Sequence, residues 1–286
     1  MQQTASHNRQ KKLAVINDFC GFGRCSIAVA LPIISAMHIQ CCPLPTAIFS
    51  DHTGFESFFC EDFTEHMPAY AGEWEKLGLH FDGIATGFLG SARQIDIVKD
   101  FLARFKGEHT KVLVDPVMGD YGKLYPTYTP ELAGRMHELL RFADLLTPNL
   151  TEACILTNTP YREDFTEQEL TVLCESLSEA GPQEIVISGI HLGDDLGNFV
   201  YSQGETAMLC AHRVGGYRSG TGDVFGAILA ADLVNGEPLE ASVRKAADFI
   251  TKTILYTQKL GVPDTDGICF EEYVWELGQT TKEVAL

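Results

Sequence analysis

Four residues have the types and spacing to bind a phosphate and to activate a hydroxyl beside it: Gly220, Thr221, Gly222 and Asp223. They follow a polar loop and open the apolar run 224–231, so a helix is expected to begin with them. Two glycines and a hydroxyl at a helix start leave main-chain N–H groups free, and the helix dipole adds positive potential there. A carboxylate at this place would repel the phosphate unless it accepted a proton from a nucleophile. The segment therefore predicts phosphoryl transfer to a small alcohol, with simple helix capping by Thr221 and Asp223 as the alternative.

The elements that would position these residues alternate along the chain between short apolar runs and helix-length amphipathic segments. Strands are expected near 13–16, 39–49, 82–87, 111–115, 144–146 and 184–188, and helices near 26–37, 92–105, 130–142, 166–180, 222–235 and 239–260. Such alternation predicts parallel βαβ units, and residues 198–202 and 206–212 predict an antiparallel hairpin at the edge. We expect an α/β fold with a central, mostly parallel sheet and helices on both faces. It would form one domain over residues 12–286, after a polar tail at 1–11.

Polar side chains follow the predicted central strands at the points where these strands end. They are Asp115, Asp120, Thr147, Asn149, Glu152 and Ser188. Because ligands of parallel sheets bind beyond the carboxyl ends of the strands, these side chains and Asp223 are expected on one rim. The carboxylates of Asp115 and Asp120 could hold a hydrated Mg²⁺ or a water bound to a phosphate. Asn149 and Glu152 stand three residues apart, a spacing that also fits a capping box.

The segment after the first strand contains Gly21-Phe22-Gly23, which invites comparison with a dinucleotide-binding motif. That motif would need a third glycine where Ser26 stands and an acidic residue about 20 residues further on, and both are missing. The sequence also lacks the G-x-x-x-x-G-K-[ST] pattern of a P-loop. We therefore expect this segment to lie on the ligand rim without binding a dinucleotide.

A cluster of hydrogen-bonding side chains, Ser50, Asp51 and His52, follows the strand expected near 39–49. Such a cluster could bind a polar heterocycle. Because Asp and Gly also favour turns, an ordinary turn is the alternative for these residues.

Charge and composition narrow the class of partner. The chain carries 21 basic and 39 acidic residues, a formal net charge of −18, which argues against nucleic acid or an anionic membrane as its main partner. An anionic substrate such as ATP would therefore need a metal ion and main-chain donors. The polar start does not resemble a signal peptide, and no apolar run reaches the roughly 18 residues of a membrane helix. Nine cysteines without a C-x-x-C pair are expected to be reduced, and we expect a cytoplasmic protein.

Together these segments resemble the ribokinase-like superfamily, and within it the vitamin B6 kinases that act on pyridoxal, pyridoxine and pyridoxamine. The resemblance extends over residues 13–260. Residues 220–223 are similar to the anion-hole and catalytic-base motif of the superfamily. Residues 115–120 and 147–152 are similar to the nucleotide and metal motifs of the B6 branch, and residues 49–54 to its substrate-side loop.

The resemblance implies a mechanism and a set of site residues. The nucleotide-binding residues would be Asp115, Asp120, Thr147, Asn149, Glu152, Ser188 and Thr221. Asp115 and Glu152 would also hold Mg²⁺, and the main-chain N–H groups of residues 220–222 would stabilise the transferred phosphoryl group. Asp223 would accept the proton of a substrate hydroxymethyl group. The resemblance further implies ATP and Mg²⁺ as cofactors and a homodimer, and it leaves room for a monovalent cation.

The substrate-binding residues that the resemblance implies are Asn17, Asp18, Thr46, Ser50, His52, Phe88 and Asp223. Two positions depart from the family pattern: Asn17-Asp18 replaces a Ser-containing segment, and Phe88 stands where many members have tyrosine. The acidic Asp18 would favour a ring that bears an amine, as in pyridoxamine. Two other functions stay open. One is a hydroxymethylpyrimidine kinase of thiamine synthesis, or another small-alcohol kinase on the same fold; the pyrimidine kinases commonly carry cysteine where this chain has Asp223. The other is a ligand-binding protein without catalysis.

Overall fold

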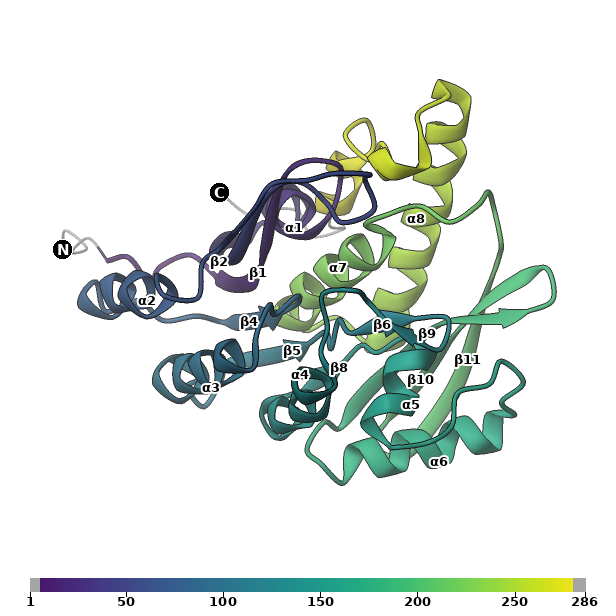
Figure 1. The fold of residues 1–286 in the computed structure, drawn as a ribbon, viewed down its shortest axis with the longest axis horizontal. Coiled ribbons are helices and arrows are strands. Elements are labelled where there is room, and N and C mark those ends of the chain that lie inside the picture. The colour runs from purple at the N-terminus through teal and green to yellow at the C-terminus, as the bar shows by residue number, and fades with distance from the viewer. Residues whose placement is uncertain (1–5, 280–286) are drawn as a thin grey trace.

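The central sheet of the computed structural model, which describes residues 6–279, contains nine strands within that range (Figure 1). In spatial order they are β11 (Glu205–His212), β10 (Asp195–Ser202), β9 (Glu184–Leu192), β8 (Leu145–Leu146), β5 (Lys111–Val114), β4 (Gly83–Thr86), β1 (Lys12–Phe22), β2 (Gln40–Asp51) and β3 (Cys60–Asp62). The six strands from β9 to β2 run parallel, whereas β3 and the hairpin β10–β11 are antiparallel additions at the two edges. The predicted parallel sheet with an edge hairpin is confirmed.

Helices cover both faces of this sheet (Figure 1). One face carries α1 (Ser26–Ala36), α7 (Thr221–Asn235) and α8 (Leu239–Leu260), followed by the 3-10 turns η2 (Asp264–Asp266) and η3 (Val274–Gly278). The other face carries α2 (Met67–Lys76), α3 (Ala92–Phe105), α4 (Pro130–Arg135), the 3-10 helix η1 (Met136–Phe142), α5 (Leu150–Leu156) and α6 (Glu167–Ser178). A separate pair of short strands, β6 (Gly119–Asp120) and β7 (Lys123–Leu124), lies between β5 and α4 in the chain.

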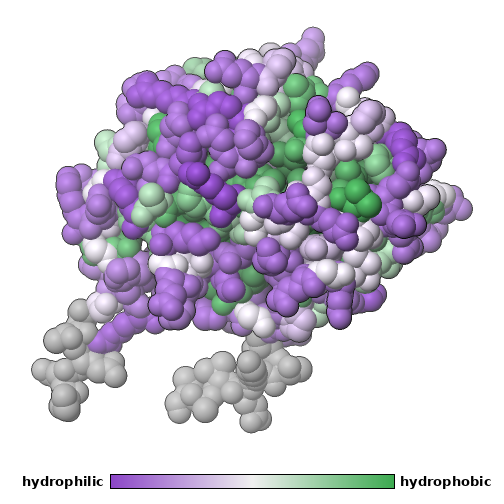
Figure 2. Space-filling view, turned by 90° about the horizontal axis from the view of Figure 1, so that it is seen from below, coloured by the Kyte–Doolittle hydropathy of each residue, from purple (hydrophilic) through white to green (hydrophobic). Residues whose placement is uncertain are grey.

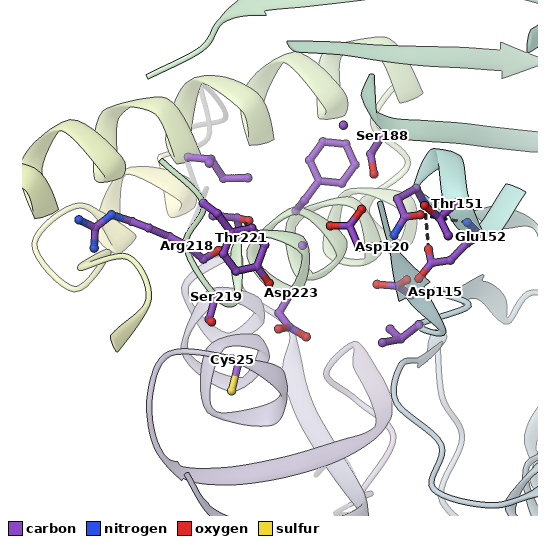
Figure 3. A pocket seen from close by; sticks show the side chains of 18 of the residues that line it. Cys25, Asp115, Asp120, Thr151, Glu152, Ser188, Arg218, Ser219, Thr221 and Asp223 are labelled. Atoms are coloured by element: carbon purple, nitrogen blue, oxygen red, sulfur yellow. Dashed lines mark hydrogen bonds between the residues drawn. The ribbon is translucent and has the colours of Figure 1, made fainter. Parts of the chain in front are cut away.

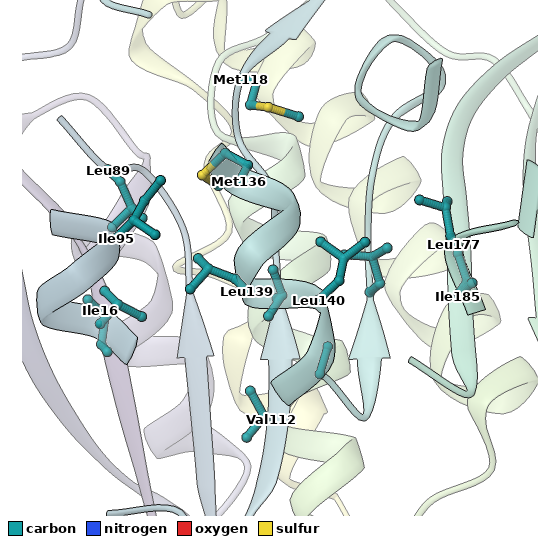
Figure 4. Close-up of a cluster of buried hydrophobic side chains, with 14 of the residues drawn as sticks. Ile16, Leu89, Ile95, Val112, Met118, Met136, Leu139, Leu140, Leu177 and Ile185 are labelled. Carbon is teal, nitrogen blue, oxygen red and sulfur yellow. The ribbon is translucent and has the colours of Figure 1, made fainter. Parts of the chain in front are cut away.

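The core consists of two apolar layers, one on each side of the sheet. On β1, Ala14 and Ile16 pack into one layer while Leu13 and Val15 pack into the other. Figure 4 shows the first layer, where Leu139 and Leu140 of η1 lie over the central strands between Ile16 and Ile185, and Leu177 of α6 lies beside Ile185. Because successive strand residues point to opposite faces and both faces are covered, the central strands are continuous apolar runs.

Strand β1 is longer than the sequence pattern predicts. Residues 17–22, expected to be a loop, continue the pairing with β2, where Phe19 lies opposite Ile48 and Phe22 opposite Asp51. The register shifts between Asn17 and Phe19, so the strand carries a bulge there. A bulge redirects side chains, and it is the reason that two successive polar residues can both be turned inward.

Two helical segments also differ from expectation. The helix expected over 130–142 ends at Arg135 and continues as the 3-10 helix η1. Helix α2 has no counterpart among the expected elements, because only Met67 and Ala71 of its residues are buried and it shows little apolar periodicity.

The surface is largely hydrophilic, in keeping with the excess of acidic residues. On the face seen in Figure 2, hydrophobic side chains form separate patches between hydrophilic ones. Within residues 6–279, no helix combines the length and the apolar character needed to cross a bilayer.

Helices α7 and α8 are joined by a buried polar contact at Asp232. One carboxylate oxygen accepts a hydrogen bond from the Ser242 hydroxyl at 2.7 Å, and the other accepts one from the Lys245 ammonium at 2.8 Å. Asp232 and Ser242 are both buried. This contact fixes α8 against α7, and the first turn of α7 carries residues 221–223.

We expect Asp232→Ala to lower the free energy of unfolding by about 2 kcal/mol, because it leaves the Ser242 hydroxyl buried without its acceptor. The control is Glu73→Ala, which removes an exposed ion pair with Lys76 and should change stability by less than about 0.5 kcal/mol. Urea unfolding of the three proteins measures both values. Equal losses in the two variants would contradict the role assigned to Asp232.

Candidate active site

A large cavity of about 640 Å³ opens at the rim where the parallel strands end (Figure 3). Of the residues expected to form the site, those that line it are Asn17, Asp18, His52, Phe88, Asp115, Asp120, Thr147, Asn149, Glu152, Ser188, Gly220, Thr221, Gly222 and Asp223. Figure 3 shows Asp115, Asp120 and Glu152 facing Thr221 and Asp223. The fold thus brings together polar residues from widely separated parts of the chain, as the positions of the strand ends predict.

Helix α7 begins at the cavity with a left-handed turn at Gly220, where φ is 79°. A Cβ atom at this position would lie 1.7 Å from the carbonyl oxygen of Arg24, so the close approach requires glycine. The first intrahelical bond runs from the N–H of Val224 to the carbonyl of Gly220. The N–H groups of the first turn therefore have no partner within the helix and are available to an anion.

Asp223 lies in this first turn and reaches the cavity. The Asn17 amide nitrogen lies 3.4 Å from one carboxylate oxygen, and the main-chain N–H of Ser26 faces the carboxylate and lowers its pKa. Burial away from water raises the pKa of Asp223 to about 6, with a smaller contribution from the nearby charge of Asp18. A carboxylate with this pKa is suited to general-base catalysis near neutral pH.

On the opposite side, Glu152 is held by the main chain rather than left free. Its two oxygens accept hydrogen bonds from the N–H groups of Met118, at 3.0 Å, and Asn149, at 2.8 Å. The Asn149 side chain accepts a hydrogen bond from the Glu152 N–H at 3.0 Å and donates to the carbonyl of Gly119 at 2.8 Å. The capping box expected from the spacing is present, and it also ties α5 to the loop that carries Asp120.

The carboxylates on this side lie in a desolvated environment. Burial raises the pKa of Asp115 well above its usual range, and the neighbouring charges of Glu152 and Asp223 raise it further. Burial also raises the pKa of Glu152, against the effect of the N–H groups that hold it. The groups that act on Asp115 are all acidic, so a bound cation would relieve their repulsion. Hard oxygen donors of this kind fit Mg²⁺.

Direct protein ligands for a metal are nevertheless few. Among residues 6–279, no group of three or more His, Cys, Asp or Glu side chains is arranged to hold a metal ion. This arrangement agrees with the chemistry of Mg²⁺, which usually keeps several waters and takes oxygens from substrate phosphates besides one or two carboxylates. Thr147 lines the cavity, and its buried hydroxyl has no hydrogen-bond partner within the described residues.

Asn17 links Asp223 to the residues around it. Its amide oxygen accepts hydrogen bonds from the N–H groups of Asp18, at 2.9 Å, and Phe88, at 2.8 Å, while its amide nitrogen faces Asp223. All of its polar atoms are therefore used within the protein. The structure places Asn17 in the wall of the site as a support for Asp223.

Asp18 is buried at the edge of the cavity. Its oxygens accept hydrogen bonds from the Ser26 hydroxyl at 2.7 Å and the Cys20 thiol at 3.2 Å. Burial raises its pKa, and these hydrogen bonds oppose that shift. Because burial outweighs the groups that lower the pKa of Asp18, a positively charged ligand group would be favoured beside this carboxylate.

Both ring nitrogens of His52 also form hydrogen bonds within the protein. Nδ1 accepts a hydrogen bond from the Gly54 N–H at 3.1 Å, and Nε2 lies 2.7 Å from the carbonyl of Thr265. Because Nδ1 is an acceptor, Nε2 carries the proton and donates it. His52 therefore presents the face of its ring, rather than its nitrogens, to a ligand.

Two residues expected on the substrate side lie outside the cavity lining. Thr46 is fully buried and donates to the carbonyl of Phe88 at 2.9 Å. Ser50 is exposed, donates to Asp51 at 2.9 Å and accepts from the Phe59 N–H at 2.8 Å. Both hydroxyls stabilise the local strand geometry, so neither is free to bind substrate in this structure.

Ser26 belongs to the site although it was not expected there. It has a φ of 52°, a left-handed conformation that favours glycine, and it stands at the place where a dinucleotide-binding motif has its third glycine. Its hydroxyl supports Asp18 and its N–H supports Asp223. The spacing of Ser26 after Gly21 and Gly23 could have indicated a left-handed backbone at this position, although serine is not the residue type that usually adopts it.

Comparison with known proteins gives a consistent set of relatives. Residues 76–266 match the family model described as phosphomethylpyrimidine kinase. The hydroxymethylpyrimidine/phosphomethylpyrimidine kinase of Haemophilus influenzae is 33% identical over 181 residues, which are 61% of this chain and 65% of that protein. The matching stretch thus spans less than two thirds of that relative's length.

Solved structures match over nearly the whole chain. One from Bacteroides thetaiotaomicron, provisionally assigned as a phosphomethylpyrimidine kinase, superposes with a TM-score of 0.94 at 35% identity and covers 98% of both chains. An orthorhombic crystal form of that description, with pyridoxal, gives a TM-score of 0.92 at 35% identity and covers 97% of this chain and 99% of the other. Pyridoxal kinase from Lactobacillus plantarum gives a TM-score of 0.87 at 27% identity, with 93% and 96% covered.

These relatives include a hydroxymethylpyrimidine/phosphomethylpyrimidine kinase and a pyridoxal kinase, and they confirm the ribokinase-like fold and the kinship with pyridoxal kinases predicted from the motifs. The match over residues 76–266 shows that the chain belongs to the phosphomethylpyrimidine kinase family.

Proposed function

We propose that this protein transfers the γ-phosphoryl group of ATP to the hydroxymethyl group of a vitamin B6 vitamer, forming the 5′-phosphate of pyridoxal, pyridoxine or pyridoxamine. The observation that carries the proposal is the first turn of α7, where Asp223 stands beside unpaired main-chain N–H groups at one end of the cavity. The presence of pyridoxal in a crystal form of the 35% identical Bacteroides protein supports a pyridine ring as substrate.

The nucleotide would lie against the ends of β5, β8 and β9. Asp120, Thr147, Asn149 and Ser188 line this part of the cavity and would contact its phosphates, directly or through water. Asp115 and Glu152 are the side chains that would hold Mg²⁺, which would supply positive charge to offset the negative charge that develops during transfer. Because Glu152 is itself held by the N–H groups of Met118 and Asn149, its carboxylate cannot rotate away.

The transferred phosphoryl group would face the start of α7. The N–H groups of residues 220–222 would stabilise its negative charge, aided by the helix dipole. Asp223 would accept the proton of the substrate hydroxymethyl group as that oxygen attacks in line. Asn17 and the Ser26 N–H hold the carboxylate during this step. The rings of Phe88 and His52 would lie against the heterocycle.

A second candidate is phosphorylation of hydroxymethylpyrimidine or of its phosphate. The family model and the 33% identical Haemophilus enzyme favour it. The same base, anion site and nucleotide side would serve the phosphorylation of hydroxymethylpyrimidine, because the reacting group is again a hydroxymethyl on an aromatic ring, whereas in its phosphate the acceptor would be a phosphate oxygen. The two candidates therefore differ in the ring that the substrate side accepts.

We also propose that the protein is a homodimer, as the resemblance to the B6 kinases implies. Exposed apolar side chains gather where β1 and β2 project beyond the rim, namely Phe19, Phe22, Ile48, Phe58 and Phe59. Such a patch favours association with another surface. We expect sedimentation velocity to give twice the mass of one chain, and Phe59→Ser to shift the population toward monomer. A monomer at all micromolar concentrations would contradict the dimer.

We expect Asp223→Asn to lower kcat by about 10²- to 10⁴-fold, because the amide cannot accept the hydroxyl proton. The assay is ATP consumption with Mg²⁺ across pyridoxal, pyridoxine, pyridoxamine, hydroxymethylpyrimidine and ribose. The control Asp100→Asn changes an exposed carboxylate on α3, outside the cavity lining, and should keep wild-type turnover. Unchanged turnover in Asp223→Asn would remove the base from the mechanism.

The same substrate panel separates the candidates. Turnover of a pyridine vitamer that disappears in Asp223→Asn supports the B6 kinase, whereas turnover restricted to the pyrimidine supports the second candidate. If Asp18 favours an amine-bearing ring, pyridoxamine will be turned over more efficiently than pyridoxal. Equal efficiency would contradict that role for Asp18.

We expect the acid limb of the pH profile of kcat/KM to have an apparent pKa of about 6, because Asp223 must be ionised to accept a proton. Activity should be present above this pH and lost as the pH falls through it. Since the charge of Asp18 raises the pKa of Asp223, Asp18→Asn should move the limb to lower pH. Asp100→Asn serves again as the control and should leave the limb in place. A limb that does not move in Asp18→Asn would show that the two carboxylates are not coupled.

A further inference from the structure

A buried arginine lies just before the turn that carries the proposed anion site, residues 220–222, here called the anion turn. Arg218 is only 7% exposed, and its carbonyl accepts a hydrogen bond from the Thr221 hydroxyl at 3.3 Å. Figure 3 shows its side chain pointing away from Thr221 and Asp223. No step of the proposed phosphoryl transfer uses this cation, so its burial needs another explanation.

The guanidinium is bound by the chain that follows α8. Nη1 donates to the carbonyl oxygens of Val262 and Pro263, each at 3.2 Å, and to that of Gly267 at 3.4 Å. Nη2 pairs with the carboxylate of Asp264 at 3.0 Å. All of these partners lie in residues 262–267, here called the η2 segment. One side chain therefore holds this segment against the loop that leads into α7.

The η2 segment also packs on the residues that seat the anion turn. The carbonyl of Asp266 accepts hydrogen bonds from the main-chain N–H of Arg24, at 3.2 Å, and from its Nη1, at 3.1 Å. A Cβ atom at Gly267 would lie 2.9 Å from the carbonyl oxygen of Arg24 and 3.1 Å from that of Ser219. The Arg24 carbonyl is the same group that leaves no space for a side chain at Gly220. The segment thus supports both parts of the chain that meet at this turn.

A further contact reaches the substrate side of the cavity. His52 Nε2 donates to the carbonyl of Thr265 at 2.7 Å, so the η2 segment also holds the ring that is proposed to lie against the heterocycle. The anion turn and His52 come from distant parts of the chain, and this segment contacts the surroundings of both.

The burial of Arg218 is not explained by stability. A buried ion pair adds little to the stability of a fold, and a buried donor without a partner lowers it. Arg218 Nε is buried and has no hydrogen-bond partner within the described residues. An arginine kept under these conditions beside a candidate active site indicates a role in arranging that site.

We propose that Arg218 is a positioning residue for phosphoryl transfer, whose guanidinium holds the η2 segment so that this segment fixes the anion turn and His52 relative to each other. The role rests on the proposed anion site, and it requires no contact between Arg218 and a substrate. The planar guanidinium donates to several carbonyls and a carboxylate at once, which the compact ammonium of a lysine cannot reproduce.

The first test compares Arg218→Ala with Arg218→Lys in the ATP-consumption assay. Loss of one preorganised donor to a developing oxyanion lowers kcat by about 10²- to 10³-fold, and a displaced turn should have a smaller effect. We therefore expect kcat to fall roughly 10- to 100-fold in Arg218→Ala and less in Arg218→Lys. KM for ATP should change by less than about threefold, because the nucleotide side is formed by other strands.

Chemical rescue separates positioning from a general loss of structure. Guanidinium chloride at millimolar concentration, far below the denaturing range, should restore part of kcat in Arg218→Ala by occupying the space of the lost side chain. Potassium chloride at the same ionic strength should not. The control Arg244→Ala removes an exposed arginine on α8, outside the cavity lining, and should keep wild-type kcat without a response to guanidinium.

Hydrogen–deuterium exchange gives a readout that does not depend on turnover. Peptides that contain residues 215–223 and 262–267 should both exchange faster in Arg218→Ala and slow again with guanidinium, whereas those of α3 should not change. Unchanged exchange in residues 215–223 or wild-type kcat in Arg218→Ala would overturn the proposal. A loss of kcat that guanidinium does not restore, or that potassium chloride restores equally, would also overturn it.

The outcomes keep this proposal distinct from the proposed function. A wild type that phosphorylates no substrate, with exchange that responds as expected, would refute the function and keep the link between the two segments. An active wild type whose exchange is unaffected by Arg218→Ala would keep the function and refute the link. If Arg218→Ala does not fold, kcat and exchange in Arg218→Lys decide, and wild-type values of both would overturn the proposal.

Discussion

The contact between Gly220 and the carbonyl of Arg24 is the constraint on which the rest of the site depends. It leaves no space for a side chain at position 220, and it seats the first turn of α7 against the loop between β1 and α1. That placement brings Asp223 beside Asn17 and Ser26, which come from the other end of the chain. The proposed base and the N–H groups of the proposed anion site share one helical turn, so a single steric contact positions both.

Desolvation is the second organising effect. Asp18, Asp115, Glu152 and Asp223 all line one cavity, and burial raises the pKa of each. Hydrogen bonds from main-chain N–H groups and from Ser26 keep the charged forms accessible. The balance would suit the proposed Mg²⁺ and a cationic or polar ring, because both would offset carboxylate charge that the protein leaves uncompensated.

Much of the fold could be predicted from the sequence. Parallel strands that are covered by helices on both faces are continuous apolar runs, and the helices that connect them follow at regular intervals in the chain. The extension of β1 beyond Ile16 could not be predicted, because its pairing with β2 depends on a bulge between Asn17 and Phe19. The same limit applies to the site. Thr46 and Ser50 have suitable side chains, but local hydrogen bonds direct both of them away from the cavity.

The sequence by itself determined the chemistry available to this protein: a glycine-rich helix start followed by a carboxylate, and polar residues at the ends of apolar strands. Periodicity and residue type carry that information because they reflect local backbone geometry and burial. Only the tertiary structure decided which polar groups are free. Asn17 and His52 are satisfied by the protein, whereas the buried hydroxyls of Thr86 and Thr147 have no hydrogen-bond partner within the described residues. Hydrogen-bond satisfaction depends on contacts between distant segments, and no local pattern encodes it.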